Sequence, residues 1–223
     1  MQIAKFLSVL LMGAAFAPGS AVAMGRFADW QTGDLIFQES TSPQASAIRV
    51  ATDSRYTHMG VIRRSDDGLY VIEAARTVTE TPLGEFIARG VGGHYSVYRV
   101  RGLTDDLAEA AITKMQAYYG RPYDIYFRMN EDAIYCSELP FHAFKALGVE
   151  IGHVERLGEL AIDTTEGRAI FLSRWQNHPD CMANGVDREG CWGLIQKQEI
   201  ITPVAIADDD NVDLVFTSFD GAP

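Results

Sequence analysis

The stretch AIYCSELPFHAFKALG, residues 133–148, carries a cysteine at the expected beginning of a helix. Apolar side chains recur at helical spacing after Cys136, and Gly148 is a typical stop signal. Pro140 is compatible with a helix only in its first turn, where a missing N–H leaves no intrahelical bond unmade. Cys136 is therefore expected at or just before the helix N-terminus.

A cysteine in this position has chemical consequences. The partial positive charge and free N–H groups of a helix N-terminus stabilise a thiolate, which lowers the thiol pKa and makes the sulfur a nucleophile. The same N–H groups could hold the oxyanion of a tetrahedral intermediate. The alternative is a buried, inert residue, because cysteine packs as a small hydrophobic side chain.

A thiolate nucleophile needs an imidazole partner, and the chain has five histidines. His142 lies on the same expected helix but about 600° of rotation away from the cysteine, so it points to another face. His94, His153 and His178 each adjoin a glycine or proline, where solvated histidines are usual. His58 differs, because it lies in a stretch rich in strand-forming residues.

The sequence around His58 predicts a β-hairpin. The strand YTHMGVI, residues 56–62, is followed by the turn-forming SDDG, residues 65–68, and a second strand, LYVIEA, residues 69–74. Such a turn places residue 73, 74 or 75 opposite His58, and in the first of these registers Glu73 faces it directly. A carboxylate in an otherwise apolar strand needs a partner if it is buried. The alternative is a surface glutamate on the solvent face of the sheet.

Other segments supply further helices and strands. We expect an amphipathic helix over residues 104–119, a short helix over 165–175, and strands over 94–100, 198–206 and 212–219. The DDDN run at 208–211 is expected to be a turn, because it lacks the spacing and the distal glutamate of a calcium loop. Metal-ligand spacing of His and Cys and a glycine-rich phosphate loop are absent from the sequence, so no metal or cofactor is expected.

Three cysteines leave one unpaired after any intrachain bond. Cys181 and Cys191 lie ten residues apart in a polar segment whose glycines permit a turn, so these two are expected to form a disulfide. Cys136 would then remain a free thiol.

Composition limits the classes of function. The 223 residues allow one domain with extensions or two small domains, and 47% hydrophobic residues can form a sizeable core. Asp and Glu number 30 against 19 Lys and Arg, which gives a net charge of -11. A negative field repels phosphate backbones, so nucleic-acid binding is the least expected class.

The first 23 residues are expected to form a secretory signal. Lys5 precedes the apolar run 6–17, and Ala21-Val22-Ala23 has the small-x-small form that signal peptidase accepts. A membrane anchor is the alternative, but the run is too short to span a bilayer and a Pro-Gly pair breaks it. We expect a mature chain, residues 24–223, that is periplasmic or secreted and has no stable membrane insertion.

Five motifs occur in a fixed order along the chain: GDLIF (33–37), YTHMGVI (56–62), YVIEA (70–74), GRPYD (120–124) and YCSELP (135–140). This order resembles the YiiX-like, circularly permuted relatives of the NlpC-type papain-like amidases. The resemblance covers about residues 30–150, and the ending EIITPVAI with VDLVFTSF resembles the last strands of the family. The segment from about 155 to 195 matches no motif and is expected to be an insertion.

The resemblance implies a role for each matching residue. Cys136 would be the nucleophile, His58 the general base and then acid, and Glu73 the group that orients the imidazole. Tyr123 matches an aromatic position on the substrate side of such sites, and Asp124, which follows it in the same motif, is also expected to contact the substrate.

Tyr56 is a further candidate for contact with substrate. It lies two residues before His58 and would share its strand face, so it could border the cleft. The alternative is an ordinary packed strand tyrosine.

These observations predict one α+β domain of the papain-like kind, with an antiparallel sheet or partial barrel packed against the cysteine helix. The function that they favour is an exported cysteine amidohydrolase acting on a small peptide or acylated amine, such as a cell-wall fragment. Two alternatives remain at this stage: a thiol-dependent acyltransferase, and a non-catalytic binding module that kept the cleft.

Overall fold

The computed structural model describes residues 27, 29–130 and 132–221. The expected secretory signal, residues 1–23, lies outside the described residues, so it stays a prediction. The chain divides into two compact units, Met1–Trp30 and Gln31–Pro223, and every helix and strand described below belongs to the second unit. Within the described residues, no helix is both long and apolar enough to cross a membrane.

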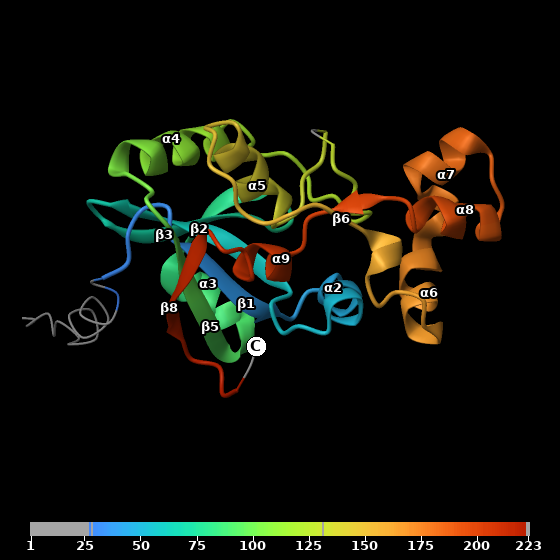
Figure 1. Ribbon diagram of the computed structural model, residues 1–223, viewed down its shortest axis with the longest axis horizontal. Helices are drawn as coiled ribbons and strands as arrows, with labels where there is room; N and C mark the ends of the chain where they lie inside the picture. The colour runs from blue at the N-terminus through green and yellow to red at the C-terminus, as the bar shows by residue number, and fades with distance from the viewer. Residues whose placement is uncertain (1–26, 28, 131, 222–223) are drawn as a thin grey trace, which may run out of the picture. The chain divides into compact units, whose positions relative to one another are not determined.

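The centre of the fold is a six-stranded antiparallel sheet with strand order β4-β3-β2-β1-β5-β8 (Figure 1). Its strands are β1 (Leu35–Ser40), β2 (His58–Ser65), β3 (Gly68–Ala74), β4 (Val78–Pro82), β5 (Gly90–Val100) and β8 (Val212–Thr217). β4 and β8 are its edges, so over the described residues the sheet is open and not a closed barrel.

Eight α-helices are described: α2 (Ala45–Thr52), α3 (Leu83–Arg89), α4 (Asp105–Gln116), α5 (Glu138–Lys145), α6 (Thr165–Phe171), α7 (Pro179–Asn184), α8 (Arg188–Ile195) and α9 (Pro203–Ala207). Two 3₁₀ segments, η1 (Leu157–Glu159) and η2 (Leu172–Asn177), and a small ladder of β6 (Glu155–Arg156) with β7 (Glu199–Ile200) complete the fold. Figure 1 shows α4 and α5 together, and α6, α7 and α8 as a cluster beyond β6.

The cysteine helix and the sheet share one hydrophobic core. Leu139 and Phe144 of α5 are fully buried in the same cluster as Leu35 and Phe37 of β1. Helix α4 packs against α5 and begins as expected, with the Thr104 hydroxyl accepting a hydrogen bond from a backbone N–H of its first turn. The expected α+β architecture is therefore confirmed.

The β2–β3 hairpin adopts the last of the three expected registers. Val61 pairs with Ile72, and Ser65 pairs with Gly68. In the same register Glu73, the residue after Ile72, lies beside Gly60 and not beside His58. The directly opposed register of His58 and Glu73 is not formed.

The expected strand over residues 198–206 is wrong. Only Glu199–Ile200 is extended, and helix α9 follows it. The cause is local, because the Thr202 hydroxyl accepts a hydrogen bond from Ala205 N and Pro203 occupies the first turn, a combination that starts a helix. The expected strand over 212–219 is present as β8 and pairs with β5.

Candidate active site

Cys136 lies directly before the N-cap of helix α5. The N-cap is Ser137, the helix begins at Glu138, and Pro140 falls in its first turn. The placement expected from the sequence is thus confirmed. Cys136 is a free cysteine, and only 1% of it is exposed.

The residues on either side of the cysteine are both fixed to Ile201. The backbone N–H of Ile201 donates to the Tyr135 hydroxyl at 3.0 Å, and its carbonyl accepts from the Ser137 hydroxyl at 2.8 Å. Because both flanking side chains are buried and bonded to one residue, the backbone of Cys136 is held in place against the short strand that precedes α9.

His58 and Glu73 are hydrogen bonded across the hairpin, with Nε2 and Oε2 2.6 Å apart. Because His58 begins β2 and Glu73 lies beside Gly60, the bond runs diagonally between the strands. A Cβ on Gly60 would lie only 2.8 Å from the Ile72 carbonyl oxygen and 3.3 Å from the Glu73 Cβ. The missing side chain therefore leaves room for the carboxylate to reach the imidazole.

Three further side chains hold this pair. The Thr81 hydroxyl donates to Oε1 of Glu73 at 2.5 Å, and the Arg89 guanidinium pairs with the same oxygen. The ring of Phe86 stacks on the ring of His58 with centroids 5.6 Å apart. Glu73 is fully buried, so these partners stabilise a charge that would otherwise be costly in the core.

The electrostatics favour a charged Cys136–His58 pair. Burial alone lowers the pKa of His58, but hydrogen bonds to Cys136 and Glu73 outweigh it and raise this pKa to about 9. Burial raises the pKa of the Cys136 thiol, but the hydrogen bond and charge of His58 prevail and lower it. Burial likewise raises the pKa of Glu73, and the bond to His58 reverses the shift. Both shifts favour a thiolate beside an imidazolium.

Tyr123 contacts the thiol and also lines a cleft. Its hydroxyl lies 4.0 Å from the Cys136 sulfur, and its ring is half-buried at the wall of a cleft. Burial raises the Tyr123 pKa, and the neighbouring Cys136 raises it further, so the phenol stays protonated.

Tyr56 does not border the cleft as expected. It is 2% exposed and packs in the core beside Phe37, with its hydroxyl donating to the Ser96 hydroxyl at 2.7 Å. The strand β2 begins only at His58, so the alternation that would place Tyr56 on the same face does not extend to it. The alternative interpretation, a packed tyrosine, describes its position.

Asp124 is also turned away from the expected contact with substrate. Its carboxylate accepts hydrogen bonds from the backbone N–H groups of Tyr126 at 2.8 Å and Arg128 at 3.0 Å, and from the Asn130 amide at 3.2 Å. The residue is buried and holds together the loop that follows Tyr123.

A cleft of about 580 Å³ opens beside His58 and Tyr123. Its other lining residues are mainly hydroxyl, amide and guanidinium side chains, among them Gln38, Thr57 and Arg76. Cys136 is almost fully buried and does not line this cleft, but its sulfur lies 4.0 Å from the hydroxyl of Tyr123, which does.

Sequence reasoning missed three residues of the site: Gln38, Thr81 and Arg89. Gln38 pairs with His58 in the β1–β2 ladder, and within the described chain its buried side-chain oxygen has no hydrogen-bond partner. Gln38 directly follows the GDLIF motif, so strand pairing could have indicated it. Arg89 ends a helix that was not expected, and no signal in the sequence pointed to it.

The remaining histidines lie outside this cluster. His142 contacts Glu138 on its own helix at 3.2 Å, and His153 is exposed. His94 is half-buried and its Nδ1 lies 2.8 Å from the Ser218 carbonyl oxygen. His178 contradicts the expectation of a solvated ring, because it is 3% exposed and lies beneath Tyr126 and Gln198.

The expected disulfide is present. Cys181 of α7 and Cys191 of α8 are bonded, with Cα atoms 5.1 Å apart. The bond joins two short helices of the segment that the motif comparison had left unmatched.

The chain matches known proteins both in sequence and in fold. Residues 29–216 match the family described as "Permuted papain-like amidase enzyme, YaeF/YiiX, C92 family". The chain belongs to this family. It is 37% identical to the "Uncharacterized protein YiiX" of Escherichia coli (strain K12) over 147 residues, which are 65% of this chain and 73% of the relative.

A solved structure of YiiX from Escherichia coli O157:H7 shares the fold of this C92 chain, with a TM-score of 0.71 and 31% identity. The match covers 85% of this chain and 98% of the other. That protein is described as a metalloprotein. In the described part of this chain, no group of three or more His, Cys, Asp or Glu side chains is arranged to hold a metal ion, so we derive no step through a metal.

Proposed function

We propose that this chain is an exported cysteine amidohydrolase that cleaves the amide bond of a small peptide or acylated amine through Cys136, His58 and Glu73. The observation that carries the proposal is the buried arrangement in which His58 is bonded to Glu73 at 2.6 Å and interacts with the thiol at the start of α5. Membership of a family of permuted papain-like amidases supports the class of reaction.

In the first step, the Cys136 thiolate attacks the carbonyl carbon of the amide and a C–S bond forms. The electron pair of the carbonyl moves to oxygen, and backbone N–H groups at the start of α5 would stabilise this oxyanion. The C–N bond then breaks as the imidazolium of His58 transfers its proton to the departing amine. A thioester between Cys136 and the acyl group remains.

In the second step, water attacks the thioester. His58, now neutral, takes a proton from the water while the carbonyl carbon forms its new C–O bond. The tetrahedral intermediate collapses, the C–S bond breaks and the carboxylic acid leaves. Glu73 holds Nε2 of the imidazole throughout, so Nδ1 is the nitrogen that faces the thiol and the substrate.

The test is hydrolysis of a panel of peptide and N-acyl amides by the purified protein, beside Cys136→Ala and a control variant of an exposed residue on helix α4, Thr113→Ala. We expect turnover by the wild type and by Thr113→Ala, and none by Cys136→Ala. Full turnover by Cys136→Ala would refute the proposal. Transfer of the acyl group to an added amine in preference to water would identify an acyltransferase instead.

A further inference from the structure

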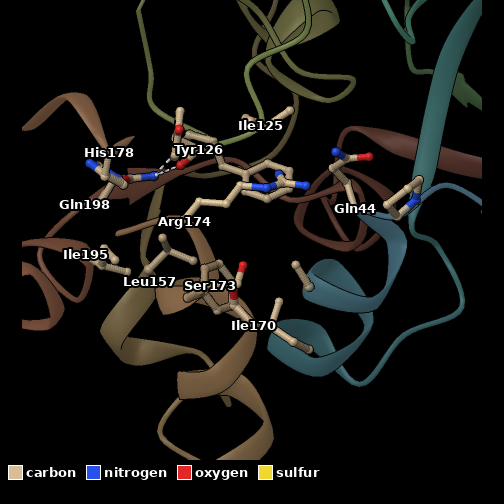
Figure 2. Close-up of a pocket in the computed structure, with 14 residues that line it drawn as sticks. Gln44, Ile125, Tyr126, Leu157, Ile170, Ser173, Arg174, His178, Ile195 and Gln198 are labelled. Carbon is tan, nitrogen blue, oxygen red and sulfur yellow. Dashed lines mark hydrogen bonds between the residues drawn. The ribbon is translucent and has the colours of Figure 1, made fainter. Parts of the chain in front are cut away.

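A second hollow, of about 70 Å³, lies next to the catalytic cleft. Figure 2 shows it between helix α2, the loop at Ile125 and Tyr126, and side chains from the segment that runs from Leu157 to Gln198. The hollow is thus lined in large part by the segment that matched no motif in the sequence.

The hollow has walls of two kinds. Leu157, Ile170 and Ile195 present apolar side chains, whereas Arg174 and His178 are polar (Figure 2). His178 is buried and its ring nitrogens make no hydrogen bond within the described part of the chain, although Nδ1 lies 4.0 Å from Oδ2 of Asp180. Buried polar atoms without a partner are rare in native proteins and often mark a place that water or a ligand completes.

The walls are fixed to each other. The Gln198 amide donates to the carbonyl oxygens of both Tyr126 and Phe127 at 2.7 Å, which ties the loop to the end of the segment. Phe127 has a φ of 55°, an uncommon conformation for a residue other than glycine, and these bonds hold it there. A hollow braced in this way is preformed rather than collapsed.

The hollow adjoins the catalytic cleft. Gln44 and Ile125 line both cavities, and the cleft also contains His58 and Tyr123. A substrate whose scissile amide lies in the cleft could therefore place one end in the hollow.

The charge of the two cavities is unusual for an acidic protein. Among the described residues that line them, none is Asp or Glu, although the chain has a net charge of -11. Arg174 in the hollow and Arg76 in the cleft make no ion pair with any described residue. Figure 2 shows the Arg174 side chain extending across the hollow on the side towards Gln44.

The volume limits the size of the occupant. A cavity needs roughly 10–15 Å³ to hold one water, so about 70 Å³ accommodates only a few non-hydrogen atoms. This fits a carboxylate on a short aliphatic stem and excludes a long acyl chain.

We propose that the hollow is a substrate subsite for a short, carboxylate-bearing aliphatic group, with Arg174 pairing with the carboxylate and Leu157, Ile170 and Ile195 contacting the stem. The inference rests on the proposed function, because it names the substrate class of the same site: a peptide-like amide with a free carboxylate near the scissile bond. The carboxylate belongs either to the C-terminus of a peptide or to an acidic side chain.

The experiment separates these two sources. The probes are acetylated alanine tetrapeptides with a free or an amidated C-terminus, and amidated tetrapeptides with glutamate or glutamine at the second position. Binding to the full chain with Cys136→Ala is measured by calorimetry, which requires no turnover. The same measurement is made with Arg174→Gln added and, as the matched control, with Arg188→Gln, an exposed arginine of the same segment outside the hollow.

We expect a free C-terminus or the glutamate probe to bind, and Arg174→Gln to weaken that binding about two- to fivefold, because Arg174 is exposed and water screens its ion pair with the carboxylate. Arg188→Gln should change nothing. Equal affinity for charged and neutral probes, no binding of either carboxylate at millimolar concentration, or an unchanged affinity in Arg174→Gln would overturn the subsite.

Turnover of the same probes by the protein that retains Cys136 distinguishes the proposed amidase activity from the proposed subsite. Cleavage without any preference for carboxylates would leave the amidase intact and refute the subsite. Carboxylate binding that depends on Arg174, with no cleavage of any amide in the wider panel, would support the subsite and refute the amidase.

Discussion

Nε2 of His58 lies 2.6 Å from Oε2 of Glu73, although the two residues do not face each other in the hairpin. The bond is diagonal, and it is possible because the residue alongside Glu73 is Gly60. The orientation of the imidazole therefore depends on both a carboxylate and a missing side chain.

The role of the Glu73 carboxylate can be tested by Glu73→Gln, which keeps the shape of the side chain and removes its charge. The loss of charge should lower the pKa of His58, because Glu73 is one of the groups that raise it, so the imidazolium loses its proton at a lower pH than in the wild type. We expect the falling limb of the pH profile of kcat/KM to move down by about one pH unit for each unit by which the His58 pKa falls. Glu85→Gln, an exposed residue of the nearby helix α3, is the control and should keep full activity.

The requirement for glycine at position 60 can be tested by Gly60→Ala. The new Cβ would lie 2.4 Å from a Val71 methyl and 2.8 Å from the Ile72 carbonyl oxygen, so the hairpin must deform. We expect the free energy of unfolding to fall by about 1–3 kcal/mol, the usual cost of overpacking. Gly84→Ala, in α3 with nothing within 4 Å of its Cβ, should be neutral or stabilising in the same denaturant titration. An unchanged midpoint for Gly60→Ala would contradict this account.

Much of this arrangement could be predicted from local sequence. Pro140 and the apolar periodicity located the helix that begins after Cys136, and the SDDG turn located the hairpin that carries His58 and Glu73. The register was left open over three values, because the form of a turn decides it and the strand pattern does not.

The errors have identifiable causes. Helix α9 forms where a strand is expected, because the N-cap at Thr202 and the proline after it outweigh the β-forming residues around them. The expectation that Tyr56 shares the strand face of His58 is wrong, because strand β2 starts only at His58, two residues after Tyr56. The hollow could not be predicted, because it depends on long-range contacts such as those of Gln198 with the loop at Tyr126.

The pH dependence of Cys136 alkylation follows from the two pKa shifts. The Cys136 pKa is lowered, so alkylation should persist well below pH 8.5, the region in which an ordinary thiol loses its thiolate. His58 is protonated up to about pH 9, so kcat/KM should rise with the formation of the ion pair and fall again as the imidazolium loses its proton.

His58→Ala provides the contrast. Without the imidazolium only burial acts strongly on the thiol, so the alkylation profile should move to higher pH than in the wild type. The rate is followed on the peptide that contains Cys136 by mass spectrometry. A profile that is identical in the two proteins would mean that the two residues are not electrostatically linked.

The loop beside the nucleophile depends on Asp124. The N–H groups of Tyr126 and Arg128 donate to different oxygens of the Asp124 carboxylate. In Asp124→Asn, one of these oxygens becomes an NH₂ group, which cannot accept, so one of the two N–H groups loses its partner. A buried donor left without a partner costs about 1–3 kcal/mol, so we expect a loss of stability of that size in denaturant titrations. Tyr123 adjoins this loop and contacts the Cys136 sulfur, so kcat/KM should fall as well. Asp132→Asn, an exposed residue further along the chain, should change neither quantity, and a variant at Asp124 that kept both would show that the loop is held by other contacts.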